Sequence, residues 1–279
     1  TFRPGNSITR AEFAKIAVAA AGLTEAAEQL VNFPSQFSDV KVGEWYTGWI
    51  NMAASQGYVK GDPAGTFRPN DNITYAEVVT VLVRLLGYDD NLRGPWPTNY
   101  LAKAVELDIT EGVAINASAP AVRGDVFIMT DNALDCYTVK WSTEHQDFEN
   151  LKAKLIVKSF KGQMDEALVT DINWDSRGNI ILSFVNEEGK TRSAKLVSNV
   201  IVTGADDAYA LLGKQVEYIK SEKSAGADTD DIVYLGLLDT DSVSKDKATF
   251  EGRYIVVDKK KYEMARGFDV TFFPEDEDW

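Results

Sequence analysis

The sequence predicts a chain of two domains, in which an all-α region is followed by a mainly antiparallel β region. A twelve-residue motif recurs along the first half, and each copy precedes apolar residues at helical spacing. Past residue 138 the pattern changes to alternating and β-branched runs. We therefore predict a multidomain α plus β protein with a helical domain over 1–138 and a sandwich or small barrel over 139–279.

The repeated motif starts each predicted capped helix. Residues 1–12 read TFRPGNSITRAE and residues 66–77 read TFRPNDNITYAE, with eight of twelve positions identical. A weaker copy, NASAPAVRGD, spans 116–125 and places Arg123 and Asp125 at the positions of Arg10 and Glu12. Apolar residues at i, i+3, i+4 and i+7 follow the first two copies and, less regularly, the third, so we predict three related helices.

The first two helices carry a capping signal. Thr9 precedes Glu12 by three residues, and Thr74 precedes Glu77 by the same spacing. This is the pattern of a capping box, in which each side chain satisfies a backbone N–H group left open at the helix start. A structural role is therefore sufficient for these four residues.

A second repeated element lies upstream of the second and third motifs. Residues 45–61 align without gaps on residues 96–112, and the apolar pairs recur at helical spacing. Each unit is thus predicted as a helix, a Gly/Pro/Asp loop and a capped helix. A unit of this size cannot bury its own apolar face, so neighbouring units are expected to pack together.

The second half is predicted as β structure. Residues 140–151 are polar and typical of a linker, and SRGN at 176–179 and EEGK at 187–190 are hairpin turn signals. Helical periodicity is confined to 206–212. Strands are predicted at 155–157, 166–174, 180–185, 193–202, 215–219, 232–238, 253–257 and 268–273.

The composition excludes several classes of function. The 279 residues carry a net charge of −14, which disfavours nucleic acid as a partner because phosphate binding needs a basic surface. Cys136 and His145, the sole residues of their types, cannot supply a Cys/His zinc cluster, and His145 is expected to be a solvated linker residue. The longest stretches without a charge, 16–24 and 112–122, are too short to span a bilayer, so no membrane insertion is expected.

Carboxylates gather at three places in the second half. Residues 227–234, 239–242 and 274–279 could bind calcium, but none has the spacing of an EF-hand loop. A solvated acidic face is the favoured interpretation. We predict no cofactor, with calcium as the alternative.

The repeats resemble the S-layer homology family. Residues 36–88 look like a complete repeat, because Phe37, Trp45, Gly61 and the ITxAE signature occur in the family's order. Residues 1–30 resemble a partial repeat that begins midway, and 94–137 a divergent one. The resemblance implies a pseudo-threefold helical bundle whose grooves hold the secondary cell wall polymer of Gram-positive bacteria.

The resemblance also implies a carboxylate contact. In this family the terminal sugar of the polymer commonly carries a pyruvate ketal, and the arginine of the TRAE signature meets its carboxylate. Arg10 is the leading match and Arg123 the second, whereas Tyr75 replaces arginine in the middle copy, so that groove is expected to lack its carboxylate partner. A guanidinium presents paired donors to a carboxylate. We expect Arg10 to be exposed, so that Arg10→Ala weakens polymer binding without loss of stability.

The other candidates come from the loops and aromatic positions. Trp45 and Trp96 are expected to be core anchors rather than sugar platforms. Asp39 and Asp62 could contact sugar hydroxyls or satisfy their own backbone. The Trp45 and Gly61–Gly65 regions are expected to form groove walls. The candidate ligand-binding residues are thus Arg10, Arg123, Asp39, Trp45, Gly61, Asp62, Tyr75 and Trp96.

These observations predict a protein without catalytic activity. The favoured hypothesis is a secreted structural protein of the cell wall or S-layer of a Gram-positive-type bacterium. It would bind the secondary cell wall polysaccharide and self-associate in a surface array through its β domain. The alternative is a wall-anchored polysaccharide hydrolase, which would need two carboxylates in a cleft that the sequence does not identify.

Overall fold

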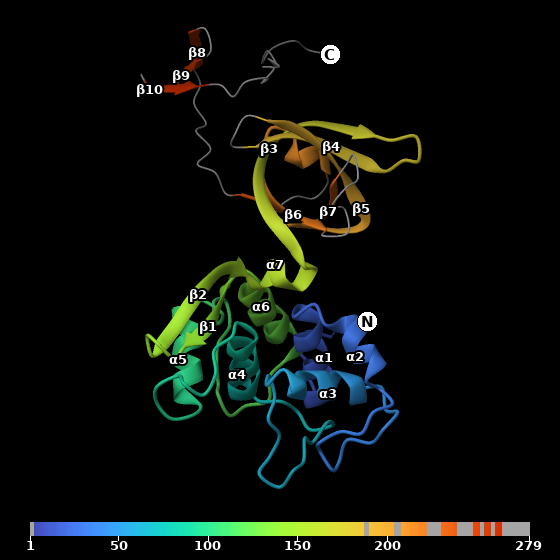
Figure 1. The fold of residues 1–279 in the computed structure, drawn as a ribbon. Coiled ribbons are helices and arrows are strands. Elements are labelled where there is room, and N and C mark those ends of the chain that lie inside the picture. The colour runs from blue at the N-terminus through green and yellow to red at the C-terminus, as the bar shows by residue number, and fades with distance from the viewer. Residues whose placement is uncertain are drawn as a thin grey trace. The chain divides into compact units, whose positions relative to one another are not determined.

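The computed structural model describes residues 3–186, 190–203, 208–221, 230–238, 248–251, 254–257 and 260–263. The chain divides into two compact units, residues 1–161 and 162–279 (Figure 1). Helices build the first unit and mainly antiparallel strands build the second. The predicted α plus β class is therefore confirmed.

The first unit contains the predicted helices. The capped helices are α1 (Arg10–Ala20), α4 (Tyr75–Leu85) and α6 (Arg123–Leu134). The helices predicted upstream of the second and third motifs are α3 (Thr47–Ser55) and α5 (Thr98–Glu106), and a short helix α2 (Thr24–Gln29) follows α1. α1 packs against α3, and α4 packs against α5.

Both predicted capping boxes are present. The Thr9 side chain accepts a hydrogen bond from the Glu12 backbone N–H, while the Glu12 carboxylate accepts one from the Thr9 backbone. Thr74 and Glu77 repeat this exchange at the start of α4. Helix α6 begins after Val122, which makes no side-chain cap. Two of the three related helices thus start at positions fixed by local sequence.

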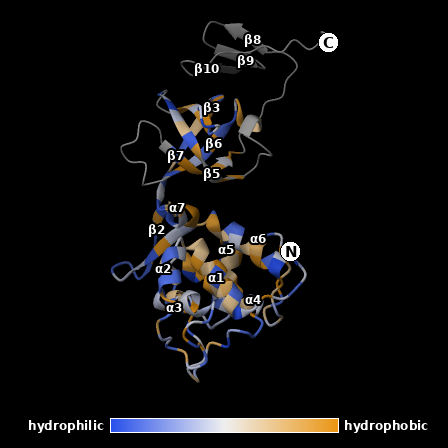
Figure 2. Ribbon diagram, turned by 90° about the vertical axis from the view of Figure 1, so that its right-hand side faces the viewer, coloured by the Kyte–Doolittle hydropathy of each residue, from blue (hydrophilic) through white to orange (hydrophobic). Residues whose placement is uncertain are grey.

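The segments that precede these helices are joined in a closed cycle. The backbone N–H of Ile8 donates to the carbonyl of Ala121, that of Ala121 to Ile73, and that of Ile73 back to Ile8. The three distances are 3.1, 2.8 and 3.0 Å. Hydrophobic residues on the helices form one continuous core, which includes the three residues of this cycle (Figure 2). Each copy of the motif is therefore stabilised by the other two.

The region predicted as a polar linker is a β-hairpin. Strands β1 (Tyr137–Ser142) and β2 (Asp147–Lys154) pair antiparallel. The Val139 N–H donates to the Leu86 carbonyl at 2.7 Å, and the ring of Phe148 lies 4.8 Å from that of Tyr88. The linker prediction was wrong because these tertiary contacts override a polar local sequence.

The strand predicted at 155–157 is also wrong, because these residues begin helix α7 (Leu155–Phe160). Leu155 is buried in the helical core. The Ser159 carbonyl approaches Gly22 so closely that a Cβ atom there would lie 2.2 Å from its oxygen. The hairpin and α7 pack on the helices, so the first compact unit extends to Lys161 rather than to the predicted boundary at 138.

The second unit contains a closed five-stranded barrel with the order β3-β4-β5-β7-β6. Strands β5 and β7 pair parallel, and the other pairs are antiparallel. This order, with a single parallel pair, is that of an OB-type Greek-key barrel. The strands are β3 (Gly162–Trp174), β4 (Ile180–Asn186), β5 (Thr191–Thr203), β6 (Gln215–Ser221) and β7 (Asp230–Leu237).

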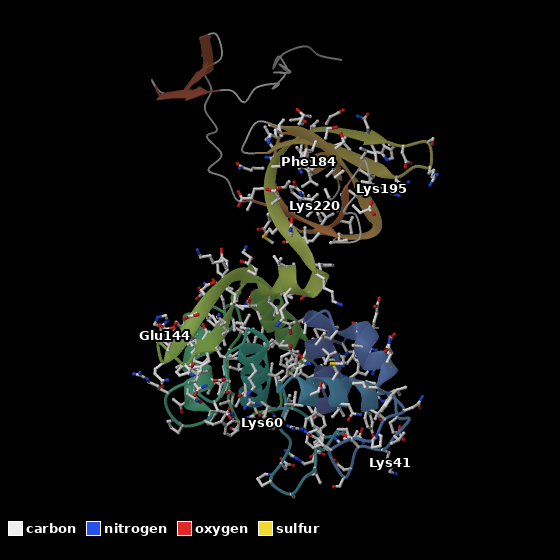
Figure 3. The ribbon with its side chains drawn as sticks, viewed as in Figure 1. Lys41, Lys60, Glu144, Phe184, Lys195 and Lys220 are labelled. Atoms are coloured by element: carbon white, nitrogen blue, oxygen red, sulfur yellow. The ribbon has the colours of Figure 1, made fainter. Side chains whose placement is uncertain are left out.

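The strands predicted from 166 to 238 all fall within the barrel, and apolar side chains fill its interior. Phe184 is buried there (Figure 3), 4.8 Å from the ring of Tyr218. The predicted turn at 176–179 is confirmed, since the Asp175 carboxylate accepts from the backbone N–H groups of Arg177 and Asn179. Within the segment predicted as helical at 206–212, Ala208–Leu211 form a 3-10 turn, η1, and 206–207 lie outside the described residues.

A separate three-stranded sheet follows, made of β8 (Ala248–Glu251), β9 (Tyr254–Val257) and β10 (Lys260–Glu263). Strand β9 covers most of the strand predicted at 253–257. The predicted strand at 268–273, most of the turn at 187–190, and the acidic segments 239–242 and 274–279 lie outside the described residues. So do residues 227–229 of the acidic segment 227–234, whereas 230–234 belong to strand β7.

Candidate functional site

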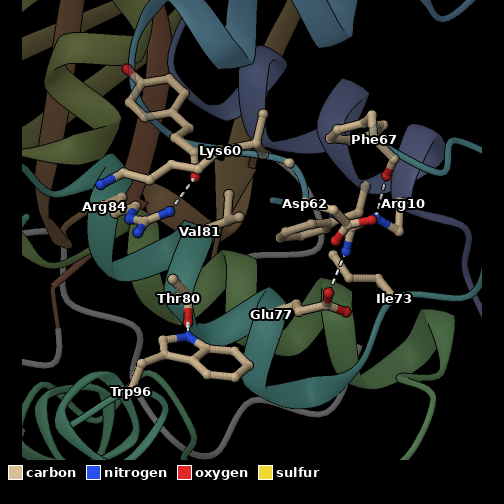
Figure 4. Close-up of a pocket in the computed structure, with 14 residues that line it drawn as sticks. Arg10, Lys60, Asp62, Phe67, Ile73, Glu77, Thr80, Val81, Arg84 and Trp96 are labelled. Atoms are coloured by element: carbon tan, nitrogen blue, oxygen red, sulfur yellow. Dashed lines mark hydrogen bonds and ion pairs between the residues drawn. The ribbon is translucent and has the colours of Figure 1, made fainter. Parts of the chain in front are cut away.

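A cleft of about 310 Å³ lies at the start of α1, beside the loop that precedes α4 (Figure 4). Its walls come from the start of α1, from the loop 58–67, from one face of α4 and from Trp96. Three copies of the repeat thus contribute to one cleft. Four candidate residues line it: Arg10, Gly61, Asp62 and Trp96.

Arg10 is buried, with 8% of its surface exposed. Its Nε atom donates to the Phe67 carbonyl at 2.7 Å, its Nη1 atom is paired with the Glu77 carboxylate, and the guanidinium lies 4.9 Å from the centroid of the Phe67 ring. The expectation of an exposed Arg10 was wrong, because the next repeat folds over the start of α1. Arg10 therefore links two repeats as well as lining the cleft.

The loop of the second repeat is held by a tight turn and an ion pair. Gly61 has a φ of +69°, and a Cβ atom at this position would lie 2.3 Å from the Phe37 ring. The Asp62 carboxylate accepts from Arg68 Nε at 2.7 Å and from the Thr66 hydroxyl at 3.1 Å. The hydrogen bond from Arg68 lowers the pKa of Asp62 below its usual range. Asp62 thus presents an ionised carboxylate at the cleft.

Trp96 and Trp45 are exposed, with 57% and 52% of their surfaces accessible. The prediction that they are core anchors was wrong, because each stands just ahead of a helix rather than on its buried face. Trp96 is fixed at the cleft by a hydrogen bond of 3.0 Å from its Nε1 to the Thr80 hydroxyl. Its ring can therefore offer an apolar face to a ligand.

Trp45 and Asp39 lie at another hollow, of about 590 Å³, which Arg68 also lines. The Asp39 carboxylate accepts from the backbone N–H groups of Phe67 and Arg68 at 2.8 and 2.7 Å. These bonds fix the loop that carries the cleft. The predicted contact of Asp39 with its own backbone is thus replaced by contacts with the backbone of a distant loop, and its contact with sugar hydroxyls stays a prediction.

The remaining candidates, Arg123 and Tyr75, line neither hollow. Arg123 Nη1 donates to Glu12 at 2.9 Å, and the Tyr75 hydroxyl donates to Asp125. Partial burial raises the pKa of Glu12, but the hydrogen bonds from Thr9 and Arg123 outweigh it and lower that pKa. Together with the pair from Arg10 to Glu77, these contacts join the three helix starts in a second cycle, whose donors run in the opposite order to those of the backbone cycle.

Sequence analysis missed two cations that line the cleft, Lys60 and Arg84. Both are paired with Asp90, and Arg84 Nη2 lies 3.2 Å from Asp90 Oδ1. Lys60 directly precedes Gly61, and Arg84 is the one charge that interrupts the apolar second half of α4. This interruption is the sequence signal that could have identified Arg84.

No group of metal-ligating side chains suited to an ion occurs among the residues that the structure describes. His145 Nδ1 lies 2.7 Å from Glu149 Oε1 at the exposed end of the hairpin. Over the same described residues, none of the helices has the length and apolar character of a membrane span.

Comparison with known proteins identifies a family that matches the segment containing much of this cleft. Residues 36–79 match the S-layer homology domain, and this range includes the loop and the first part of α4. The chain is 44% identical over 128 residues to a middle cell wall protein of Brevibacillus brevis, which covers 46% of the chain and 12% of that protein. It is 31% identical over 242 residues to a cell surface protein of Thermoanaerobacter kivui. This match covers 85% of the chain and 29% of that protein.

The similarity extends to an enzyme. The chain is 32% identical over 134 residues to the exoglucanase XynX of Acetivibrio thermocellus, which covers 43% of the chain and 12% of the enzyme. The chain therefore spans less than a third of the length of each of these relatives.

Proposed function

Since this chain belongs to the family of surface proteins that carry an S-layer homology domain, we propose that its helical unit anchors a secreted protein non-covalently to the bacterial cell wall. The ligand is the secondary cell wall polysaccharide, and the cleft at Arg10 takes its pyruvylated end. The function is binding, without a chemical step.

One observation carries this proposal. Arg10, Asp62 and Trp96 come from three copies of the repeat and line one cleft. A guanidinium suits a carboxylate, an ionised carboxylate suits sugar hydroxyls, and an indole face packs on a sugar ring. The combination of these three groups fits an acidic sugar, even though the chain as a whole is acidic.

The contacts of Arg10 indicate how it would bind. The protein itself uses Nε and Nη1, which donate to Phe67 and Glu77. We assign the Nη2 donors to the ketal carboxylate of the ligand. Because Nε and Nη1 hold the guanidinium in place, little side-chain entropy is lost on binding.

We further propose that the repeats 1–30, 36–88 and 94–137 form a pseudo-threefold bundle. The cyclic backbone bonds among Ile8, Ile73 and Ala121 support this arrangement. Arg123 is the second candidate for a carboxylate contact. Trp45 and Gly61 would shape the groove walls, and Asp39 would contact sugar hydroxyls.

The β half is proposed to serve assembly or display, in a surface array formed with further copies. The alternative is a wall-anchored enzyme, for which the similarity to the exoglucanase is weaker support than the similarity to the cell wall and surface proteins. Assays of the chain on wall polysaccharide and on β-glucan would separate these two functions. Release of reducing sugar by the chain itself would favour the enzyme.

Calorimetric titration with purified secondary cell wall polymer, before and after chemical removal of the pyruvate, tests the anchoring function. We expect binding that is lost with the ketal and weakened by Trp96→Ala. Lys152→Gln, an exposed substitution on the hairpin, serves as the control. Equal binding of both forms of the polymer would contradict the carboxylate contact.

A further inference from the structure

The two ends of the cleft differ in charge. At one end Arg10 is paired with Glu77, and Asp62 is paired with Arg68. At the other end Lys60 and Arg84 share a single carboxylate, that of Asp90. Figure 4 shows Lys60 and Arg84 together on one side of the pocket and Arg10 on the other. The Lys60 end therefore carries a surplus of positive charge within a chain of net charge −14.

Arg84 is held rigidly at that end. Its Nη1 atom donates to the Tyr58 carbonyl at 3.4 Å and its Nε atom to the Tyr100 hydroxyl at 3.3 Å, while the guanidinium lies 5.3 Å from the centroid of the Tyr100 ring. Its side chain is 13% exposed. A cation fixed by such contacts loses little entropy when it binds an anion.

Lys60 and Asp90 are the exposed partners at this end of the cleft. Their side chains are 55% and 64% exposed, so water screens the ion pair between them and it contributes little to stability. Lys60 lowers the pKa of Asp90, which is therefore ionised at neutral pH. An incoming anion can thus replace Asp90 beside Lys60 and Arg84 at little cost.

The spacing of the two ends follows from α4. Glu77, the partner of Arg10, and Arg84 are seven residues apart on this helix, a rise of about 10 Å. A single carboxylate cannot bridge the two ends. A ligand that engages both carries two anionic groups on neighbouring parts of its chain.

We propose that Lys60 and Arg84 form a second anion subsite of the cleft, which takes a further carboxylate or phosphate of the polymer next to its pyruvylated end. This inference rests on the proposed function and specifies the ligand as a polyanionic saccharide. It also gives Asp90 a role, as the group that occupies the subsite before the ligand binds.

Two probes test the subsite by calorimetric titration of the full chain. The first is a pyruvylated monosaccharide with one negative charge. The second is a polymer fragment with a pyruvylated end and one further anionic substituent, prepared in a carboxylate and a phosphate form. We expect Lys60→Gln to weaken binding of the second probe about tenfold, the loss of about one charge-assisted hydrogen bond, and to leave the first unchanged.

Asp90→Asn provides the opposite change, because it removes the competing carboxylate. It is expected to strengthen binding of the second probe, and Lys152→Gln to leave both probes unchanged. A stronger effect of Lys60→Gln on one form of the second probe would identify the substituent as carboxylate or phosphate. The subsite is refuted if Lys60→Gln and Lys152→Gln have equal effects on the second probe.

These outcomes separate the subsite from the anchoring function. If the wild-type chain binds the monosaccharide and Trp96→Ala does not, the anchoring function is supported, whatever the effect of Lys60→Gln. Failure of the wild-type chain to bind either probe would overturn both proposals.

Discussion

The hydroxyl of Tyr75 donates a hydrogen bond to the carboxylate of Asp125. Tyr75 stands at the repeat position of Arg10 and Arg123, whose guanidinium groups contact Glu77 and Glu12. The tyrosine thus keeps the contact to the next repeat although it carries no charge. Within the protein the phenol thus replaces the guanidinium as donor, and the expectation that this groove lacks a partner for the carboxylate of the ligand stays a prediction.

Tyr75→Phe removes this donor and leaves the partly buried Asp125 carboxylate without it. We expect a loss of about 1 to 3 kcal/mol in the free energy of unfolding, the usual effect of deleting a hydrogen bond to a charged group. Urea denaturation measures it. Tyr137→Phe, at an exposed tyrosine, is the control, and equal stability of the two variants would contradict the role of Tyr75.

Arg10→Ala is expected to lower the free energy of unfolding by about 1 to 3 kcal/mol, because it deletes an ion pair and leaves the Phe67 carbonyl without a donor. This reverses the expectation from sequence that the variant keeps its stability. Urea denaturation must therefore accompany any binding assay of this variant. An unchanged unfolding midpoint would show that the contacts of Arg10 contribute nothing to the fold.

The two exposed tryptophans form a matched pair. Trp96→Ala and Trp45→Ala should each change the free energy of unfolding by about 1 kcal/mol or less, because more than half of each residue is exposed. Polymer binding should fall further in Trp96→Ala, since Trp96 alone of the two lines the cleft at Arg10. Equal binding losses would place the ligand across both hollows.

Acid should destabilise the helical unit through Glu12. The pKa of Glu12 in the folded state lies below its ordinary value of 4.5, so its ionised form stabilises the fold above that pH. This contribution to stability is lost as the pH falls through the pKa that Glu12 has in the folded state. Glu12→Gln keeps the capping box but removes the charge, and should flatten the dependence of the unfolding midpoint on pH between about 5 and 3. Glu28→Gln, at an exposed glutamate, should leave the dependence unchanged.

The thiol of Cys136 should react slowly in the folded protein. Burial raises its pKa to about 11, so only about one thiol in a thousand is ionised at pH 8. Alkylation by iodoacetamide, followed by mass spectrometry, should be roughly a hundredfold slower than in urea. Equal rates in both conditions would show that the thiol is accessible in the native state.

The sequence by itself determined the helices α1, α3, α4, α5 and α6, the two capping boxes and most of the barrel strands, because these depend on residues close together in the chain. Thr9 and Glu12 are three residues apart, and alternation within 180–185 requires no distant partner. The resemblance carried by the repeated motif also identified Arg10 as the leading ligand contact, which the structure places at a cleft. Local pattern was sufficient for these features.

Tertiary structure alone decided the burial of Arg10, the exposure of the tryptophans and the secondary structure of residues 139–161. Arg10 is buried because the Phe67 loop of another repeat covers it, and the polar hairpin forms because Phe148 packs on Tyr88. Lys60 and Arg84 become neighbours because both reach Asp90 from separate segments. Such contacts join residues distant in sequence, and no local pattern encodes them.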